Sequence, residues 1–458
     1  MGRGVRCAGI AALAVVLTGC WLQVGGGAGN TRFNPFETVL TPDAAPSLSV
    51  DWRRLPVDGV AMLEPVVWGE RVFVTAVKHA DGVDPVNIGA VRAYGRDSGD
   101  LLWERSLLPD PLVDGSVEPA VVIDGTVWVR YRHDGMPDCT GRLARLDPGS
   151  GAVLSDESVG VPSFLDPVVG HASLVMYVEG VGCSGNRLVV RDLATRATLW
   201  TYTFPADHWP TTPTVAHGKI IVVTGGPRHR GEAIYAFDAA GCGSGVCEPH
   251  WVVTDPTVPS TFDRAVAGPH GLVYVTRAEG SHFIVRALDA ASGAEGWRSD
   301  ARYHASLPKG ALRYAVMGDA LYVKGYIDEG PEIGDGSGTL DMYPAAGCGD
   351  AICTPDWTID LGEDIGTSAA PTAAAGMVYL GVDADSGTPP RLLGIDPAAC
   401  STATCTPSVD VALQNPPHGG VYLFGAGPTE MSVAGGQVFI VMNWLSPMEL
   451  IALSPTDG

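Results

Sequence analysis

Short runs of aliphatic, β-branched and aromatic residues recur along this chain, and a small or polar turn residue introduces each of them. The runs lie at 69–77, 125–132, 172–180, 218–226, 271–278, 319–326, 376–383 and 436–443. Residues of this kind are typical of a strand that is buried between two sheets. The pattern therefore predicts eight equivalent buried strands, each in one copy of a repeated unit.

A second pattern alternates with these runs: a strand, a polar turn, and a further strand that carries a bulky residue. Tryptophan takes the bulky position at Trp103, Trp200, Trp251, Trp297 and Trp357, with Leu154 and Val409 in two other copies. The turn starts with aspartate at Asp147, Asp192, Asp238, Asp289 and Asp396. An aspartate there can accept hydrogen bonds from the backbone of the turn. The bulky residue would fill the space between neighbouring units.

Each unit thus needs four antiparallel strands, which is the composition of one propeller blade. The chain holds 59 Gly and 35 Pro but only 17% charged residues, as many short strands joined by tight turns require. The eighth unit lacks its last strand, and residues 47–55 have the missing pattern. We predict an all-β fold over residues 47–458: an eight-bladed β-propeller of four-stranded antiparallel blades, whose ring is closed by this N-terminal strand, protecting an open edge.

The N-terminus carries a targeting pattern. Arg3 and Arg6 precede an apolar stretch at 7–19, which is too short to span a bilayer but suits a signal peptide. The stretch ends at Cys20 in a pattern that resembles the lipobox of bacterial lipoproteins, which implies a lipid such as palmitate on this cysteine. The alternative is an ordinary secretion signal with an incidental cysteine. We expect residues 1–20 to be the signal peptide with its lipobox cysteine, and the Gly-rich residues 21–46 to form a flexible tether.

Eight cysteines remain after Cys7 and Cys20, an even number in a chain expected to be exported. Six of them form three pairs with C-x4-C spacing, Cys242/Cys247, Cys348/Cys353 and Cys400/Cys405. Metal sites more often show C-x2-C, so we predict three local disulfides and no metal. Cys139 and Cys183 occupy equivalent places in neighbouring repeats, so we predict a disulfide between these two blades.

The repeat resembles the PQQ-like β-propeller repeat, most clearly at Asp289-Ala-Ala-Ser292-Gly293 followed by Trp297. This resemblance implies two kinds of function. Some members are quinoprotein dehydrogenases that use PQQ with Ca²⁺, and others are scaffolds, among them the barrel-assembly lipoproteins of the outer membrane. The chain has neither the adjacent cysteine pair of many such dehydrogenases nor a C-x-x-C-H haem motif. We therefore expect a protein that is not an enzyme, with no catalytic residues and no cofactor; PQQ with Ca²⁺ is the alternative.

Few other segments indicate chemistry. Asp328, Glu329, Glu332, Asp335 and Asp341 form either a Ca²⁺-binding loop or, as we favour, a solvated acidic loop. The glycines at 180–185 are interpreted as turn residues of a hairpin because no helix follows them.

Loops at 208–210, 304–309 and 416–422 combine aromatic, proline and charged residues, which suits a protein or glycan partner if these loops share one face. The net charge of -22 argues against nucleic acid. The sequence thus predicts a monomeric protein-interaction scaffold, lipid-anchored on the extracytoplasmic face of the cell membrane. A ligand or glycan sensor is a further alternative.

Overall fold

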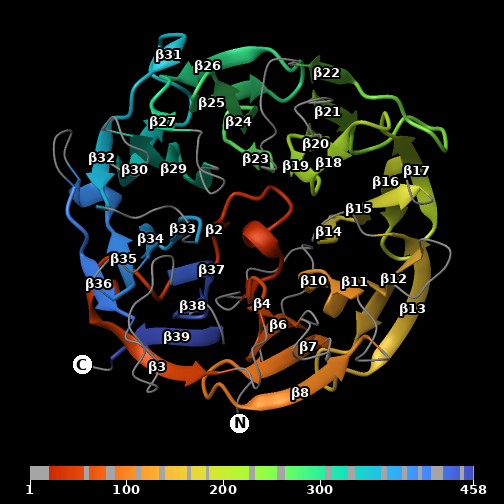
Figure 1. The fold of residues 1–458 in the computed structure, drawn as a ribbon, viewed down its shortest axis with the longest axis horizontal. Coiled ribbons are helices and arrows are strands. Elements are labelled where there is room, and N and C mark those ends of the chain that lie inside the picture. The colour runs from red at the N-terminus through yellow and green to blue at the C-terminus, as the bar shows by residue number, and fades with distance from the viewer. Residues whose placement is uncertain are drawn as a thin grey trace.

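The chain folds into eight separate β-sheets that surround one axis as the blades of a propeller (Figure 1). This structure is a computed structural model. It describes residues 20–55, 61–78, 88–108, 115–133, 140–161, 167–181, 185–225, 233–254, 264–304, 312–328, 336–362, 369–383, 389–400, 405–413, 427–443 and 448–456. The predicted fold class is confirmed, because each sheet is built on four antiparallel strands.

We number the four strands of each blade from the axis outward. They are β5 (Val66–Trp68), β6 (Arg71–Lys78), β7 (Ile88–Gly95) and β8 (Leu101–Ser106) in blade 1; β10 (Val121–Ile123), β11 (Thr126–His133), β12 (Thr140–Leu146) and β13 (Val153–Gly160) in blade 2; β14 (Val169–His171), β15 (Leu174–Val181), β16 (Gly185–Asp192) and β17 (Thr198–Thr203) in blade 3; and β19 (Thr214–Ala216), β20 (Lys219–Gly225), β21 (Ala233–Asp238) and β22 (Trp251–Thr254) in blade 4.

The second half of the ring repeats this arrangement. Its strands are β23 (Val266–Ala267), β24 (Leu272–Glu279), β25 (His282–Asp289) and β26 (Glu295–Ser299) in blade 5; β28 (Arg313–Met317), β29 (Ala320–Asp328), β30 (Gly336–Pro344) and β32 (Trp357–Asp360) in blade 6; β33 (Thr372–Ala374), β34 (Met377–Val382), β35 (Arg391–Ile395) and β36 (Val409–Ala412) in blade 7; and β37 (Gly427–Ala434), β38 (Gln437–Asn443), β39 (Glu449–Pro455) and β3 (Leu48–Arg54) in blade 8.

Shorter elements extend several blades. These strands are β1 (Cys20–Trp21), β2 (Phe33–Asn34), β4 (Ala61–Met62), β9 (Gly115–Val117), β18 (Trp209–Pro210), β27 (Tyr303–His304) and β31 (Ile352–Cys353). The 3-10 helices are η1 (Val24–Gly26), η2 (Ala45–Ser47) and η3 (Pro397–Ala399). No helix in the described part of the chain is both long enough and apolar enough to cross a membrane.

The two ends of the ring differ in their connections. Because neighbouring strands are antiparallel, the turns from first to second and from third to fourth strand lie at one end, which we call the turn face. The connections from second to third strand and from blade to blade lie at the other end, the loop face. The aromatic loops at 208–210, 304–309 and 416–422 each join two blades, so the strand ends that flank them share the loop face. Residues 305–311 and 414–426 lie outside the described residues.

The ring closes as predicted. β3 supplies the outer strand of blade 8 and pairs antiparallel with β39 at the C-terminal end, with Val50 opposite Leu453 and Trp52 opposite Ala452. The first and last parts of the propeller therefore share one sheet. This arrangement ties the ends of the ring together by backbone hydrogen bonds and leaves no blade one strand short.

The repeated tryptophans lie between neighbouring blades, as the sequence predicts. Trp103 in blade 1 is buried, and its indole N–H donates to the carbonyl oxygen of Pro148 in the turn of blade 2, at 3.0 Å. Trp52, Trp251 and Trp297 make the same kind of bond to the turns of the next blades, and Trp200 and Trp357 are also buried. Each bond joins the fourth strand of one blade to the third-to-fourth turn of the next.

The turn beneath Trp103 requires glycine. Gly151 has φ +67°, and a Cβ built there would lie 2.5 Å from the indole ring. Glycine is the residue that adopts this left-handed conformation at low cost, and it leaves room for the ring. The repeated glycine and the repeated tryptophan of the sequence thus pack against each other where two blades meet.

The turn aspartates accept hydrogen bonds, with one exception. The Asp147 carboxylate accepts from the backbone N–H groups of Gly149 and Ser150 at 3.0 and 2.8 Å. Asp192, Asp289 and Asp396 accept from their own turns in the same way. For Asp238 this prediction was wrong: its carboxylate binds the Lys219 ammonium group across the β20–β21 hairpin. A cation directly opposite in the sheet competes successfully with the turn N–H groups.

These turns should make the stability depend on acid pH. Hydrogen bonds from the Ser150 side chain and the turn backbone lower the pKa of Asp147 below its ordinary value of 3.8. A carboxyl group with a lowered pKa in the folded state adds stability above pH 3.8, and this contribution is lost as the pH falls through the folded value. We expect Asp147→Asn to lower the urea midpoint at pH 7, and to approach the wild type at pH 3. An equal difference at both pH values would contradict this assignment.

The three local disulfides are present, and two of them hold loops across the neighbouring blade. The bridge Cys348–Cys353 closes the third-to-fourth connection of blade 6. This connection carries β31, which adds parallel to β26, the outer strand of blade 5. The loop of Cys242–Cys247 reaches β17 of blade 3 similarly, where Cys247 N–H donates to the Thr201 carbonyl. The third bridge, Cys400–Cys405, packs against the apolar cluster that contains Trp357. The first two disulfides thus hold a loop in place over the outer edge of the neighbouring blade.

Removing the bridge of blade 6 should loosen that cover. Closing so short a loop contributes about 2 kcal/mol in the chain-entropy model. We expect Cys348→Ser with Cys353→Ser to destabilise the protein by about that amount. Amide hydrogen exchange should accelerate at Arg298 and Asp300, whose N–H groups donate to Ala351 and Cys353. Exchange in the central strand β25 should stay unchanged; faster exchange there as well would indicate global unfolding instead.

Candidate functional site

The central channel of the propeller contains the protein's own N-terminal segment. Residues 20–34, with β1, η1 and β2, run through the middle of the ring and not away from it (Figure 1). β1 pairs antiparallel with β5 of blade 1, and β2 pairs parallel with β33 of blade 7. We call residues 20–34 the channel segment. The prediction that residues 21–46 form a flexible tether is therefore wrong.

The channel segment contacts the eight blades one after another. After β1 on blade 1, hydrogen bonds join Leu22 O to Val122 N, Gln23 to Gly170, Ala28 O to Val215 N, Gly29 O to Ala267 N, Thr31 O to Val316 N and Arg32 O to Ala373 N. Arg32 and Asn34 then donate to the carbonyl oxygens of Met431 and Val433 in blade 8. The inner strands thus satisfy the backbone of a segment that has almost no regular structure of its own.

A buried polar cluster forms where this segment returns to blades 1 and 8. The Arg32 guanidinium donates to the Glu64 carboxylate at 3.0 Å, and both side chains are almost fully buried. The other Glu64 oxygen accepts from the Trp21 indole N–H at 3.1 Å and from Gly25 N–H at 2.8 Å. Glu64 therefore binds three points of the channel segment at once. A buried carboxylate with a matched cation and further donors is well compensated.

A second carboxyl group completes this cluster. Glu430 on β37 shares a hydrogen bond with Glu64. Burial, followed by repulsion from Glu64, raises the pKa of Glu430 to about 7. The positive charges of Arg32 and Arg313 oppose this rise. A carboxyl group that is buried beside a second carboxylate can keep its proton near neutral pH, and Glu430 is such a group. A buried carboxyl group with a raised pKa of this kind marks a candidate functional site.

The segment leaves the channel at the turn face. The buried Glu37 carboxylate accepts from the N–H groups of Val39 and Leu40 through one oxygen. Its other oxygen accepts from Gly436 N–H, in a turn of blade 8, at 2.9 Å. The sequence analysis missed this arrangement because it interpreted the high glycine content of residues 21–46 as the sign of a flexible tether. Trp21, Arg32 and Glu37, three large side chains in a Gly-rich stretch, were the available signal.

The cysteines assigned outside the local pairs have different outcomes. Cys139 and Cys183 lie outside the described residues, so a bridge between them stays a prediction. Cys20 is described, is buried at the start of β1, and is disulfide-bonded. A sulfur atom in a disulfide cannot also carry a lipid thioether. Lipidation of Cys20 stays a prediction for a form of the protein without this bond, and the signal peptide at 1–19 lies outside the described residues.

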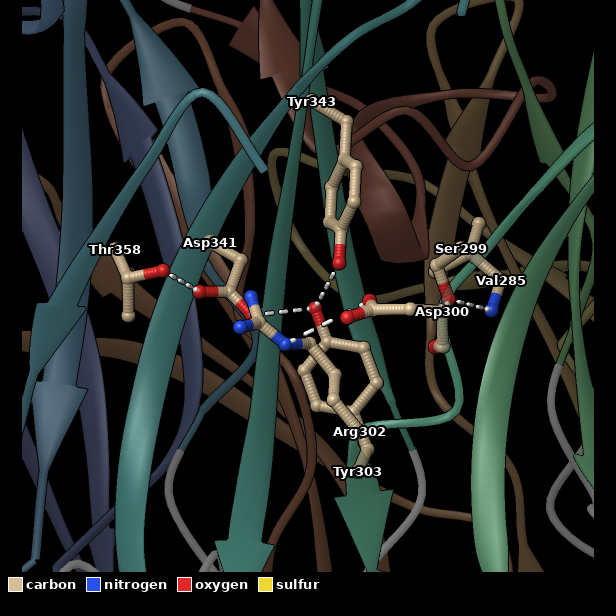
Figure 2. A network of polar contacts seen from close by, with 8 residues as sticks. All are labelled: Val285, Ser299, Asp300, Arg302, Tyr303, Asp341, Tyr343 and Thr358. Carbon is tan, nitrogen blue, oxygen red and sulfur yellow. Dashed lines mark hydrogen bonds and ion pairs between the residues drawn. The ribbon is translucent and has the colours of Figure 1, made fainter. Parts of the chain in front are cut away.

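The structure describes only some residues of the predicted acidic loop. Residues 329–335 lie outside the described residues, but Asp341 is fully buried on β30 and belongs to no solvated loop (Figure 2). Its carboxylate accepts from Tyr303 Oη at 2.6 Å and from the Thr358 hydroxyl, and Arg302 lies nearby. Burial raises the pKa of Asp341. These residues join blades 5 and 6, so we interpret this network as structural.

The aromatic loop of blade 4 also packs locally where it is described. His208 Nδ1 lies 2.9 Å from Tyr235 Oη and 3.2 Å from the Thr224 hydroxyl. Burial lowers the pKa of His208, which keeps the imidazole neutral at pH 7. Within the described ranges, no group of three or more His, Cys, Asp or Glu residues could hold a metal ion. We therefore take Arg32, Glu64 and Glu430 as the candidate functional site.

Comparison with solved structures finds the same fold in quinohemoprotein alcohol dehydrogenases. A quinohemoprotein alcohol dehydrogenase from Pseudomonas putida HK5 matches with a TM-score of 0.62 and 12% identity, over 96% of this chain and 81% of that chain. The quinohemoprotein alcohol dehydrogenase of Comamonas testosteroni matches with a TM-score of 0.60 and 13% identity, over 96% and 82%. BamB from Moraxella catarrhalis matches with a TM-score of 0.41 and 16% identity, over 73% and 96%.

Comparison by sequence finds no similar protein: no family model and no curated protein matches this chain. The solved structures show the fold, at identities too low to carry an activity with it. They also correct one prediction. The two dehydrogenases with TM-scores of 0.62 and 0.60 are enzymes, which contradicts our expectation from the sequence that this propeller is not an enzyme.

Proposed function

We propose that this propeller is a protein-interaction scaffold of the bacterial cell envelope. The observation that carries the proposal is the channel segment, which fills the axis and forms hydrogen bonds with all eight blades. With the axis occupied by the chain itself, the loop face, the turn face and the outer rim are the surfaces left for recognition. A ring of tied blades presents such surfaces rigidly, as a binding platform requires.

We further propose that, in a form of the protein without the disulfide at Cys20, a lipid on this cysteine attaches the protein to the extracytoplasmic face of the cell membrane. Cys20 lies opposite Trp68, just before the turn at Gly69, so the chain enters the propeller at the turn face. A lipid there would direct the turn face toward the membrane and the loop face away from it. Labelling with a palmitate analogue should mark the wild type and fail on Cys20→Ser. Label retained by Cys20→Ser would contradict the anchor.

The loop face is the surface on which we would search for the partner. Asp207 and Ser281 are exposed near or at this face, on blades 4 and 5. A photo-crosslinking residue at either position should give one adduct with the same envelope protein, identified by mass spectrometry. The matched control is Asp356, which is exposed in the turn-face connection of blade 6. No adduct from the loop face, or the same adduct from Asp356, would count against this scaffold role.

A second candidate is a quinone-dependent dehydrogenase, favoured by the TM-scores against two quinohemoprotein enzymes. The described channel does not fit a cofactor such as PQQ with Ca²⁺. The channel segment runs through the middle of the ring (Figure 1), and both Glu64 oxygens already accept hydrogen bonds from Trp21, Gly25 and Arg32. We therefore derive no catalytic step through such a group.

A thermal-unfolding titration with PQQ and Ca²⁺ separates the two candidates. A ligand that binds only the folded state adds roughly 2.7 kcal/mol at 100 times its dissociation constant. The scaffold proposal expects no shift in the unfolding midpoint. A dose-dependent rise would favour the dehydrogenase and would require the channel segment to move.

A further inference from the structure

The outer strands of blades 1 to 3 carry an apolar row that the other blades lack. Leu102, Leu154 and Leu199 occupy the same place, one residue before the position of the repeated tryptophan, and are 49, 52 and 44% exposed. Leu101 and Val153 beside them are 53 and 48% exposed. We call these five residues the rim patch. The sequence-based assignment of Leu154 to the tryptophan position was one residue off, because Ser155 pairs with Arg145 there.

The equivalent position in the other five blades shows whether the fold needs a leucine there. At the place equivalent to Leu102, blades 8, 4, 5, 6 and 7 carry Asp51, His250, Gly296, Asp356 and Ser408. None of these is aliphatic, so this place on the blade does not need a leucine for folding. Three consecutive blades with aliphatic residues there form a patch, which is a stronger indication of an interface than scattered exposed residues.

Side-chain contacts join the outer strands of blades 1, 2 and 3 into one surface. Arg105 on β8 donates to the Gly151 carbonyl in the turn of blade 2, at 2.8 Å. Glu157 on β13 binds both Arg191 and Arg196 of blade 3, at 2.8 and 2.9 Å. These contacts hold blades 1, 2 and 3 in register at the level of the patch. A partner would therefore meet a preformed surface and would not have to order it.

Among the described residues, the outer edges of blades 1 and 2 are uncovered. The outer strands of blades 3 and 5 receive backbone hydrogen bonds from the disulfide-closed loops of the next blades. In the part of the chain that the structure describes, β8 and β13 have no strand on their outer side. An uncovered edge with exposed aliphatic residues is a site for association with another chain.

Charge indicates what kind of chain would bind. The turns that lead into the patch carry four aspartates at the turn face: Asp97 and Asp100 are exposed, and Asp147 and Asp192 are half-buried. Arg96 and Arg54 pair with the two exposed carboxylates. The whole protein has a net charge of -22. Anionic lipid would be repelled by this net charge, whereas lysine and arginine side chains would be attracted.

We propose that the rim patch docks a protein segment that combines aliphatic with lysine or arginine side chains. The aliphatic side chains would cover the leucines, and the cations would meet the turn aspartates. This surface lies on blades 1 to 3 at the turn face, apart from the loop face considered above. The inference therefore does not depend on the partner proposed for the loop face, and either can fail alone.

Binding of defined peptides tests the proposal. The probes are fluorescent peptides of alternating Lys and Leu, alternating Glu and Leu, and alternating Lys and Ser. We expect only the Lys–Leu peptide to bind the full protein, more weakly as salt increases. The variant Leu102→Ser, Leu154→Ser, Leu199→Ser should weaken this binding at least about tenfold, the effect of losing central apolar contacts. The matched control, Val252→Ser with Ile352→Ser, changes exposed aliphatic residues outside the patch and should change binding less than about twofold.

Four results would overturn the proposal. Equal affinity of wild type and the triple serine variant would show that the patch is not the site. Equal binding of the Lys–Ser peptide would show attraction by charge alone. Binding to vesicles of phosphatidylcholine and phosphatidylglycerol that needs the three leucines would identify a lipid surface. Concentration-dependent dimers in sedimentation that the triple variant loses would identify a second copy of this chain.

Discussion

Replacing Trp103 by alanine should lower the free energy of unfolding by about 3–5 kcal/mol, the usual cost of removing a buried indole. The ring is buried between blades 1 and 2, 5.8 Å from the Phe73 ring, and its N–H donates to the Pro148 carbonyl. The substitution leaves a cavity and an unsatisfied carbonyl group at once. Denaturant unfolding at pH 7 measures the loss.

The neighbouring residue supplies the control for this change. Leu102 precedes Trp103 on the same strand but is 49% exposed. We expect Leu102→Ala to change the stability by less than about 0.5 kcal/mol, as surface substitutions do. If Trp103→Ala cost no more than Leu102→Ala, the indole would not be part of the contact between blades 1 and 2.

Replacing Arg32 by methionine should destabilise the protein by about 3–5 kcal/mol at pH 8, because Glu64 would keep a buried charge without its partner. The loss should be smaller at pH 5, where Glu430 holds its proton and the cluster carries one negative charge fewer. A second substitution, Glu64→Gln, should recover much of the stability by removing that charge. Thermal unfolding of the three proteins at both pH values measures this.

Glu430→Gln gives the complementary result. The pKa of Glu430 is raised from 4.5 to about 7, so the folded state binds its proton more tightly than the unfolded chain does. The stability linked to this group is fully present below pH 4.5 and is lost as the pH rises through about 7. The glutamine variant should therefore equal or exceed the wild type at pH 8. A loss of less than about 1 kcal/mol for Arg32→Met at pH 8 would instead show that the cluster does not hold the segment.

The filled channel changes how the structural similarity is interpreted. The quinohemoprotein dehydrogenases share the fold at 12 and 13% identity, and their class of activity contradicts the expectation that this propeller is not an enzyme. In this chain, however, the channel segment runs through the middle of the ring (Figure 1), and its Trp21 and Arg32 side chains bind Glu64. The same ring of blades can thus be closed at its centre by its own N-terminal residues. A shared fold therefore does not by itself imply a shared function.

The sequence by itself determined the ring of blades. The buried strands, the turn aspartates and the tryptophan positions follow from side-chain type and spacing over a few residues, and eight copies confirm one another. The three local disulfides and the closing strand at 47–55 were predicted on the same basis, because a missing strand in one unit and a spare one elsewhere must match. Local chemistry decides these features, so a linear pattern can show them.

Only the tertiary structure decided what lies on the axis. Arg32 meets Glu64 across 32 residues and the Met431 carbonyl across 399, and no local pattern connects these positions. Residues 21–46 resemble a linker because their glycines give no periodicity, and their hydrogen-bonding partners belong to eight other segments. The rim patch was hidden for a similar reason: a bulge of one residue separates the buried Trp103 from the exposed Leu102. Closing the ring brings such groups together, and that closure is a property of the whole chain.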